Sequence, residues 1–138
     1  MRAGRIVVTL AVVALGFGLF IPTALAGKKK KKTTVVFNGG SPSVSGKNVK
    51  AKGSLKTARA CLVARGIKLF QTDASGNVLA TLDSKSTDSN GNWNVSGHIP
   101  SSVPANTTFY VQVKAKKRAV GKFVCKAGFS PVIQLTSK

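Results

Sequence analysis

The chain has 138 residues, and its 22 Lys and Arg against 3 Asp and Glu give a formal charge of +19 at pH 7. This length excludes two full domains, and the near absence of carboxylates argues against catalysis by paired acidic side chains. The charge excess also predicts attraction to polyanions.

Residues 1–26 have the three parts of a secretory signal peptide. Arg2 and Arg5 make a positive start, Ile6–Ile21 is an apolar run that we expect to be helical, and Ala24-Leu25-Ala26 supplies the small residues that signal peptidase requires. We expect cleavage between Ala26 and Gly27, no membrane span afterwards, and a secreted or envelope-associated protein. The part after Ala26 keeps 20 of the 22 cations and all three aspartates, a charge of +17.

An uncleaved anchor is the alternative, because a helix of about 20 apolar residues can span a bilayer. The positive charges that follow the apolar run would then favour a cytoplasmic domain.

A lysine-rich segment, residues 27–34, comes next. Lys28, Lys29, Lys30, Lys31 and Lys32 are consecutive, and five adjacent like charges repel one another. We therefore predict a mobile cationic arm ahead of the folded domain.

Residues 35–138 read as short alternating strands separated by Gly-, Asn- and Asp-rich turns, with no helical period. The turns are Asp73–Asn77 and Asp88–Asn92, and a proline-bearing loop covers Pro100–Thr107. The predicted strands are Thr33–Phe37, Lys47–Lys56, Cys61–Val63 continuing through Gly66–Gln71, Val78–Leu82, Trp93–Ile99, Phe109–Lys116, Lys122–Lys126 and Pro131–Leu135. About seven such strands predict an all-β fold, an antiparallel two-sheet sandwich.

Cys61 and Cys125 are the only cysteines, an even number that suits an exported chain. We predict that they form a disulfide. Closing a loop of about 65 residues would stabilise the fold by about 4 kcal/mol in the chain-entropy model.

Two motifs carry a resemblance to a known family. Cys61, Arg65, Ile67 and Leu69 open a hairpin, and a Thr-Asp-x-x-Gly-x-Trp segment follows at Thr87, Asp88, Gly91 and Trp93, ahead of the FYVQV strand and Cys125. This pattern resembles the prealbumin-like sandwiches related to carboxypeptidase regulatory domains, particularly small secreted bacterial versions. The resemblance implies a structural or binding module. A generic immunoglobulin-like sandwich is the alternative.

The residues available for catalysis are few, so we predict that the chain is not an enzyme and needs no cofactor. Asp73, Asp83 and Asp88 lie in or beside turns, and His98 is the single histidine. One histidine without a second His or a Glu does not make an ordinary zinc site. The segment Asp88–Asn92 lacks the closing glutamate of a calcium loop, so we predict no metal.

A lysine-rich face is the strongest functional hint. If the strands Lys47–Lys56 and Phe109–Lys116 share a sheet, their outward lysines lie on one face, which the following residues and the arm extend. The predicted polyanion-binding residues are Lys28, Lys29, Lys30, Lys31, Lys32, Lys50, Lys52, Lys56, Lys114, Lys116, Lys117 and Arg118.

The expected partners are anionic cell-wall polymers, acidic glycans or other polyanions, bound with steep salt dependence. Sequence-specific nucleic-acid recognition is not expected, because no aromatic platform is apparent. Two alternatives stay open: a structural or protein-interaction domain whose charge is incidental, and an enzyme inhibitor acting through Pro100–Thr107.

Overall fold

The computed structural model describes residues 28–138, so the expected signal peptide 1–26 and its cleavage site at Ala26–Gly27 lie outside the described residues. Twelve short strands and one 3₁₀ turn make up this part, which confirms the all-β prediction. No helix in residues 28–138 is long and apolar enough to cross a membrane.

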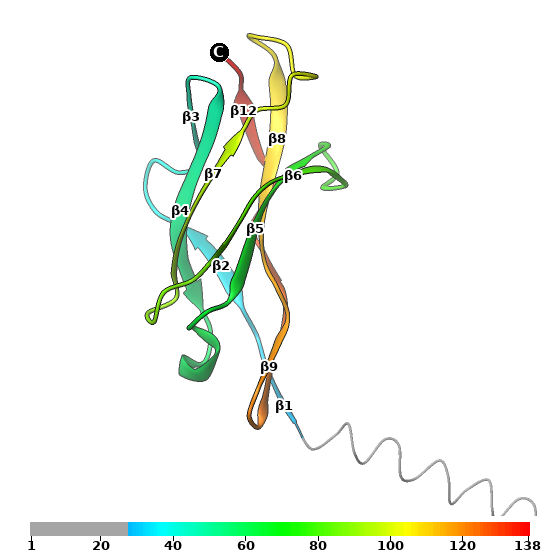
Figure 1. Cartoon of the computed structure of the whole chain (residues 1–138). Helices are drawn as coiled ribbons and strands as arrows, with labels where there is room; N and C mark the ends of the chain where they lie inside the picture. The colour runs from blue at the N-terminus through cyan, green and yellow to red at the C-terminus, as the bar shows by residue number, and fades with distance from the viewer. Residues whose placement is uncertain (1–27) are drawn as a thin grey trace, which may run out of the picture.

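Two antiparallel sheets form the sandwich (Figure 1). The first sheet has β4 (Asn48–Lys56) at its centre, with β7 (Asn92–His98) on one edge and β2 (Thr34–Phe37) and β3 (Ser43–Ser45) sharing the other. The second sheet places β5 (Gly66–Thr72) between β6 (Val78–Ser86) and β8 (Thr108–Ala115). The far edge of β8 pairs with β11 (Gly128–Phe129) and β12 (Ile133–Thr136).

A smaller sheet stands at one end of the sandwich, where β1 and β9 are labelled in Figure 1. We call it the basic ribbon: strands β1 (Lys29–Lys31), β10 (Phe123–Cys125) and β9 (Arg118–Val120), with Lys28, Lys32, Lys116, Lys117, Gly121, Lys122 and Lys126 that flank them. β1 is parallel to β10, whereas β9 and β10 form an antiparallel hairpin.

The core lies between the two large sheets and is built by alternation. In β4, buried and outward residues alternate strictly, with Val49, Ala51, Gly53 and Leu55 inside. β8 does the same, with Phe109, Val111, Val113 and Ala115 inside. A period of two places one face of each strand against the other sheet, so the predicted alternation in both segments is confirmed.

The segment around Cys61 differs from the prediction. Residues Cys61–Val63 do not extend the next strand: Arg59–Cys61 is a 3₁₀ turn, and Ala64 has a φ of +52°. The backbone N–H of Arg65 and the carbonyl of Leu62 both bond to the Thr87 hydroxyl, at 2.8 Å and 2.5 Å. These bonds hold a compact loop, so β5 begins only at Gly66.

The predicted mobile arm is also corrected where the structure describes it. Lys29–Lys31 form strand β1, in which the Lys29 N–H donates to Lys122 O at 3.0 Å and Lys31 O accepts from the Lys126 N–H at 2.9 Å. Thr33, expected at the end of the arm, is buried. Backbone pairing satisfies the peptide groups while the lysine side chains still reach solvent, so like charges do not prevent a strand here.

Asp73–Asn77 and Asp88–Asn92 form the two predicted turns with one shared hydrogen-bond pattern. The Asp73 carboxylate accepts from the N–H groups of Ser75 and Asn77, and the Asp88 carboxylate accepts from those of Asn90 and Asn92, all at 2.9 Å. In each turn the glycine at the fourth position has a positive φ. These bonds lower the pKa of both carboxyls, chiefly through Asn77 for Asp73 and through the Asn92 N–H for Asp88.

Candidate anion-binding ribbon

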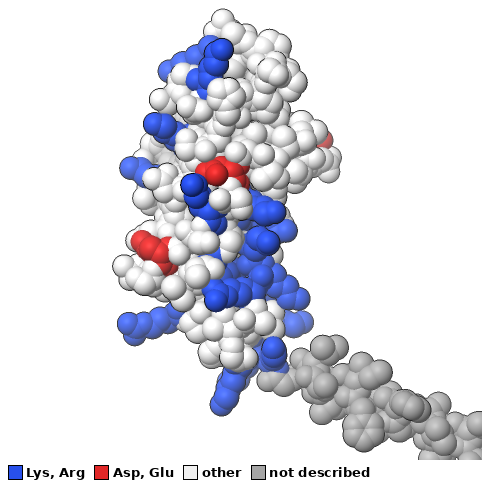
Figure 2. Space-filling model, in the orientation of Figure 1, with Lys and Arg blue, Asp and Glu red and all other residues white. Residues whose placement is uncertain are grey.

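The basic ribbon concentrates positive charge at one end of the molecule. Five lysines come from residues 28–32 and five cations from residues 116–126, and neither segment contains an Asp or Glu. Nine of the ten side chains are exposed, and Lys31 is half-buried. Figure 2 shows Lys and Arg gathered on the half of the visible face that leads to this end. A cluster of this density produces a field that attracts polyanions.

The ribbon brings together residues that are about 90 positions apart in the chain, as Lys29 pairs with Phe123 and Lys31 pairs with Cys125. The Lys31 ammonium lies 5.1 Å from the centre of the Phe123 ring, a cation–π contact. The strands fix the backbone beneath the lysines, so a polyanion would meet an ordered row of charge.

The disulfide fastens the ribbon to the sandwich. Cys61 and Cys125 are bonded as predicted, with their Cα atoms 5.6 Å apart, and both are fully buried. Cys125 ends β10 and Cys61 ends the 3₁₀ turn, so the bridge ties the ribbon's central strand to the loop before β5.

Arg65 is a second anchor and carries a fully buried charge. Its guanidinium donates to Lys116 O at 3.1 and 2.8 Å, to Lys126 O at 3.1 Å and to Cys61 O at 3.0 Å, and also to the Thr33 hydroxyl at 3.2 Å. Burial, and secondarily the charge of Arg118, lower the pKa of Arg65 from its ordinary value. A buried charge without such bonds would be strongly destabilising, so Arg65 is structural and binds the ribbon's backbone from below.

The predicted single lysine face is not formed. β4 lies in the first sheet and β8 in the second, so Lys50 and Lys52 project from the opposite side of the sandwich to Lys114. The period-two pattern predicted which residues point outward, but pairing partners depend on the order of strands, which it does not contain. Lys56 ends β4 opposite Thr34, two residues from the lysine run.

The Arg118 side chain makes hydrogen bonds within the protein. One guanidinium nitrogen donates to Val63 O and Ala64 O, both at 2.8 Å. Those carbonyls belong to the loop in which Ala64 has its positive φ. Arg118 therefore contributes charge to the ribbon but is held in place by this loop.

The sequence reasoning missed four cations, two in the ribbon and two on the second sheet. Lys122 and Lys126 flank β10, and Lys68 lies opposite Lys114 across β5 and β8. Lys85 lies on β6, opposite Ile67. The alternation in the β5 segment could have identified Lys68 as outward, and the +17 charge implied that further lysines would join any patch.

Lys114 has a second neighbour, the exposed Phe129. Phe129 pairs with Lys114 across β8 and β11, and the Lys114 ammonium lies 5.4 Å from its ring centre. Lys114 and Phe129 thus form a cation–π pair on the outer face of the second sheet, with the ring exposed.

The Thr-Asp-x-x-Gly-x-Trp segment has structural roles throughout. Thr87 bonds the loop before β5, Asp88 caps its own turn, and Trp93 packs in the core against Phe37 at 5.7 Å between ring centres. A side chain at Gly91 would come within 2.6 Å of Leu62 Cδ2. The four residues of the motif that carries the family resemblance therefore make packing and turn contacts.

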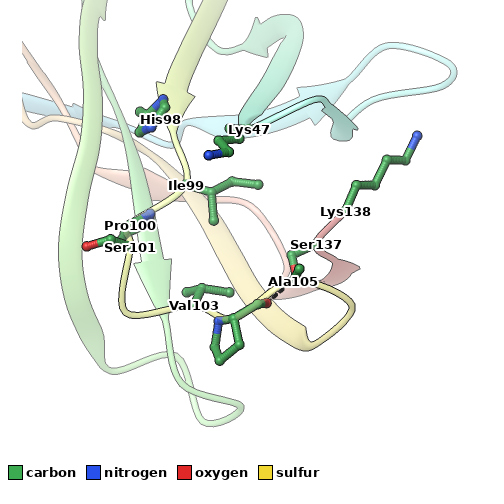
Figure 3. A pocket seen from close by; sticks show the side chains of 10 residues that line it. Lys47, His98, Ile99, Pro100, Ser101, Val103, Ala105, Ser137 and Lys138 are labelled. Carbon is green, nitrogen blue, oxygen red and sulfur yellow. Dashed lines mark hydrogen bonds between the residues drawn. The ribbon is translucent and has the colours of Figure 1, made fainter.

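A cavity of about 450 Å³ lies at the other end of the sandwich, beside the loop Pro100–Thr107 (Figure 3). Ile99 and Val103 line its centre, and the Lys138 side chain extends away from it. His98 lies at its rim, with Nδ1 3.3 Å from Asn48 Oδ1. Its lining has one imidazole and no Asp or Glu side chain, so it holds no imidazole–carboxylate pair of side chains.

Two other candidates for chemistry within residues 28–138 are a metal site and the Asp83 carboxylate. No group of three or more His, Cys, Asp or Glu side chains there is placed to hold a metal ion. Asp83 accepts from the Ser96 N–H at 2.8 Å and so joins β6 of the second sheet to β7 of the first.

Comparison with known proteins supports the fold. No family model and no curated protein matches the chain. One solved structure is similar, that of a "putative carbohydrate binding protein" from Bacteroides uniformis, with a TM-score of 0.51 and 15% identity over 77% of this chain. This chain spans 56% of that structure, which is about half its length. At this identity the likeness shows a shared β-rich fold.

Proposed function

We propose that the protein is a non-catalytic binding module that associates with anionic glycans or wall polymers through the basic ribbon. The observation that carries this proposal is the ten-cation ribbon without a single carboxylate, held on a rigid end of the sandwich by Cys61–Cys125 and Arg65. Many carboxylate or sulfate groups along a polymer would meet these cations in parallel, which makes the association strong at low salt.

Two further observations favour a glycan over other polyanions. The structurally similar Bacteroides uniformis protein is named for carbohydrate binding. Phe129, exposed beside Lys114, offers an apolar ring face of the kind on which pyranose rings stack.

The proposed site of action is outside the cytoplasm. A buried disulfide between distant cysteines is typical of oxidising compartments. We propose export through residues 1–26 with cleavage at Ala26–Gly27. Within the sandwich folds we also propose kinship to the prealbumin-like domains, supported by the packing roles of Thr87, Gly91 and Trp93.

Heparin-column retention in a salt gradient tests the proposal. Lys30/Lys122→Gln removes two exposed ribbon charges, and Lys47/Lys138→Gln removes two exposed charges beside the cavity at the other end. Since each phosphate-like contact changes the logarithmic salt slope by roughly 0.7 to 0.9, the ribbon variant should elute at clearly lower salt and show a slope smaller by about 1.5.

The matched variant should elute close to wild type, because its lysines are far from the ribbon. Equal shifts in the two variants would mean that heparin senses net charge alone, and that result would refute a localised site. A wild-type protein that fails to bind heparin, polygalacturonate and teichoic acid at 50 mM salt would refute polyanion binding altogether.

A further inference from the structure

A polar groove crosses the outer face of the first sheet, apart from the ribbon. Its volume is about 420 Å³, within the range of small-ligand sites. It runs from the end of β2 over β4 and β7 to the β6–β7 turn, and its walls carry the side chains of Asn38, Lys52, Lys85, Asp88, Asn92 and Asn94. A neighbouring hollow of about 390 Å³ shares Lys52 and Asn94 and extends the groove along β4.

The groove walls are held by hydrogen bonds. On one side, the Asn38 N–H donates to Lys52 O at 3.0 Å, and the Lys52 N–H donates to the Ser41 hydroxyl at 2.8 Å. On the other side, the Asp88 carboxylate accepts from the Asn92 N–H at 2.9 Å. These bonds fix the backbone that carries the lining side chains, and a preorganised backbone lowers the entropy cost of ligand binding.

The chemistry of the lining suits an acidic sugar. Three asparagine amides present donors and acceptors together, which matches vicinal hydroxyl groups. Lys52 and Lys85 supply two ammonium groups for a carboxylate. The single carboxylate in the groove, Asp88, is already engaged by the N–H groups of its own turn.

An unusual polar atom lies beneath the groove, on the core side of the sheet. Trp93 is only 3% exposed, and its Nε1 is the buried side-chain nitrogen or oxygen that lacks a hydrogen-bond partner in the part of the chain that the structure describes. A Cβ on Gly53 would come within 2.7 Å of Trp93 Cζ2, which shares its ring neighbour Cε2 with Nε1. Trp93 and Gly53 both alternate with outward residues, so the indole lies on the core side of the sheet, beneath the strands that carry Lys52 and Asn94.

We propose that this groove is a specific subsite for a short acidic oligosaccharide of the uronic-acid type. The asparagine amides bind sugar hydroxyls, and Lys52 and Lys85 bind the carboxylate. The proposal rests on the proposed function, because it names the sugar class and places its recognition in the groove while the ribbon holds the polymer by charge.

Tryptophan fluorescence tests the subsite directly, because Trp93 is the only tryptophan in the chain. Trigalacturonic acid should change the emission in a saturable way at 150 mM salt, whereas neutral maltotriose should not. Lys52/Asn94→Gln/Ala should weaken the affinity at least about tenfold, since it removes one charged and one neutral hydrogen-bonding partner. Lys68/Asn48→Gln/Ala, a matched change on outward strand positions outside the groove, should leave the affinity within twofold.

The outcomes separate this inference from the proposed function. The Lys30/Lys122→Gln ribbon variant should elute from heparin at lower salt and keep the fluorescence response. Retention on heparin without any response to trigalacturonic acid would overturn the groove proposal and leave the ribbon function standing. An equal response to maltotriose would overturn the assignment to acidic sugars. Equal losses of affinity in Lys52/Asn94→Gln/Ala and in its control Lys68/Asn48→Gln/Ala would overturn the location of the site.

Discussion

The basic ribbon and the polar groove lie on one small molecule but differ in nearly every physical respect. The ribbon has ten cations, no carboxylate and no enclosing walls, whereas the groove combines two lysines with three asparagines and one aspartate around a hollow of about 420 Å³. Charge without shape gives attraction that is long-range, sensitive to salt and weakly selective. In the proposed subsite, amides on a fixed backbone would give short-range recognition of one class of sugar.

The two regions are also stabilised differently. The ribbon pairs three short strands whose lysines repel one another, so it depends on Cys61–Cys125 and on Arg65 below it. The groove lies on β4 and β7, which are paired over seven positions and packed on the core. A region of high like charge is therefore held by anchors from outside itself.

Removing the disulfide should have the largest effect. Cys61→Ala with Cys125→Ala should lower the free energy of unfolding by about 4 kcal/mol, because the denatured chain is no longer closed into a loop of about 65 residues. In the folded fraction, the amides of β1, β9 and β10 should exchange hydrogen faster, while those of β4 and β7 should change little. Hydrogen exchange with mass spectrometry measures both, and equal protection of β10 and β4 in the variant would contradict an external anchor.

Gly53→Ala should damage the groove and spare the ribbon. Its new Cβ would overlap the Val36 carbonyl and approach Trp93 Cζ2 at 2.7 Å, so we expect a loss of about 1–3 kcal/mol and a shifted Trp93 emission. Gly39→Ala is the matched control, because nothing lies within 4 Å of its Cβ. Denaturant unfolding followed by fluorescence measures the stability of both variants. Unchanged stability in Gly53→Ala would show that the groove floor is not tightly packed. Heparin elution should stay the same in both variants.

Acidification should have the smallest effect on the stability of the fold. Substitutions in the Asp73 and Asp88 turns should then distinguish one turn from the other. The hydrogen bonds from Asn77 and Asn92 lower the pKa of Asp73 and Asp88 in the folded protein, so the unfolded chain binds more protons at low pH. Their stabilisation is complete above the unfolded carboxyl value of about 3.9 and is lost as the pH falls through the lower folded values.

Thermal unfolding measured from pH 6 to pH 2 should therefore show a falling midpoint in this acidic window. Asp73→Asn and Asp88→Asn should each reduce the slope of that fall, but only Asp88→Asn should alter Trp93 emission, since Asp88 lines the groove. Identical changes of Trp93 emission in the two variants would contradict the placement of Asp88 beside the groove.

Local chemistry made much of the fold predictable. Near neighbours in the chain produce the alternation in β4 and β8 and both Asp-initiated turns. The disulfide was predictable because the chain has two cysteines, which allow one pairing. The strand predicted at Cys61–Val63 was wrong, because bonds from the distant Thr87 hold that segment in a loop. The lysine cluster was predicted only in part: Lys28–Lys32 and Lys116–Arg118 belong to one ribbon, on either side of β10, but Lys50 and Lys52 face elsewhere.

The charge excess, the all-β character, the alternation in β4 and β8 and the cysteine pair were predictable from the sequence, because each depends on composition or on a period of two. Only the tertiary structure decided which strands are neighbours. It brought Lys29–Lys31 beside Phe123–Cys125, buried Arg65 beneath them, and aligned Lys52, Asn94 and Asp88 along one groove. Strand order is set by how whole faces pack together, and that is a property of the assembled sandwich and not of any one segment.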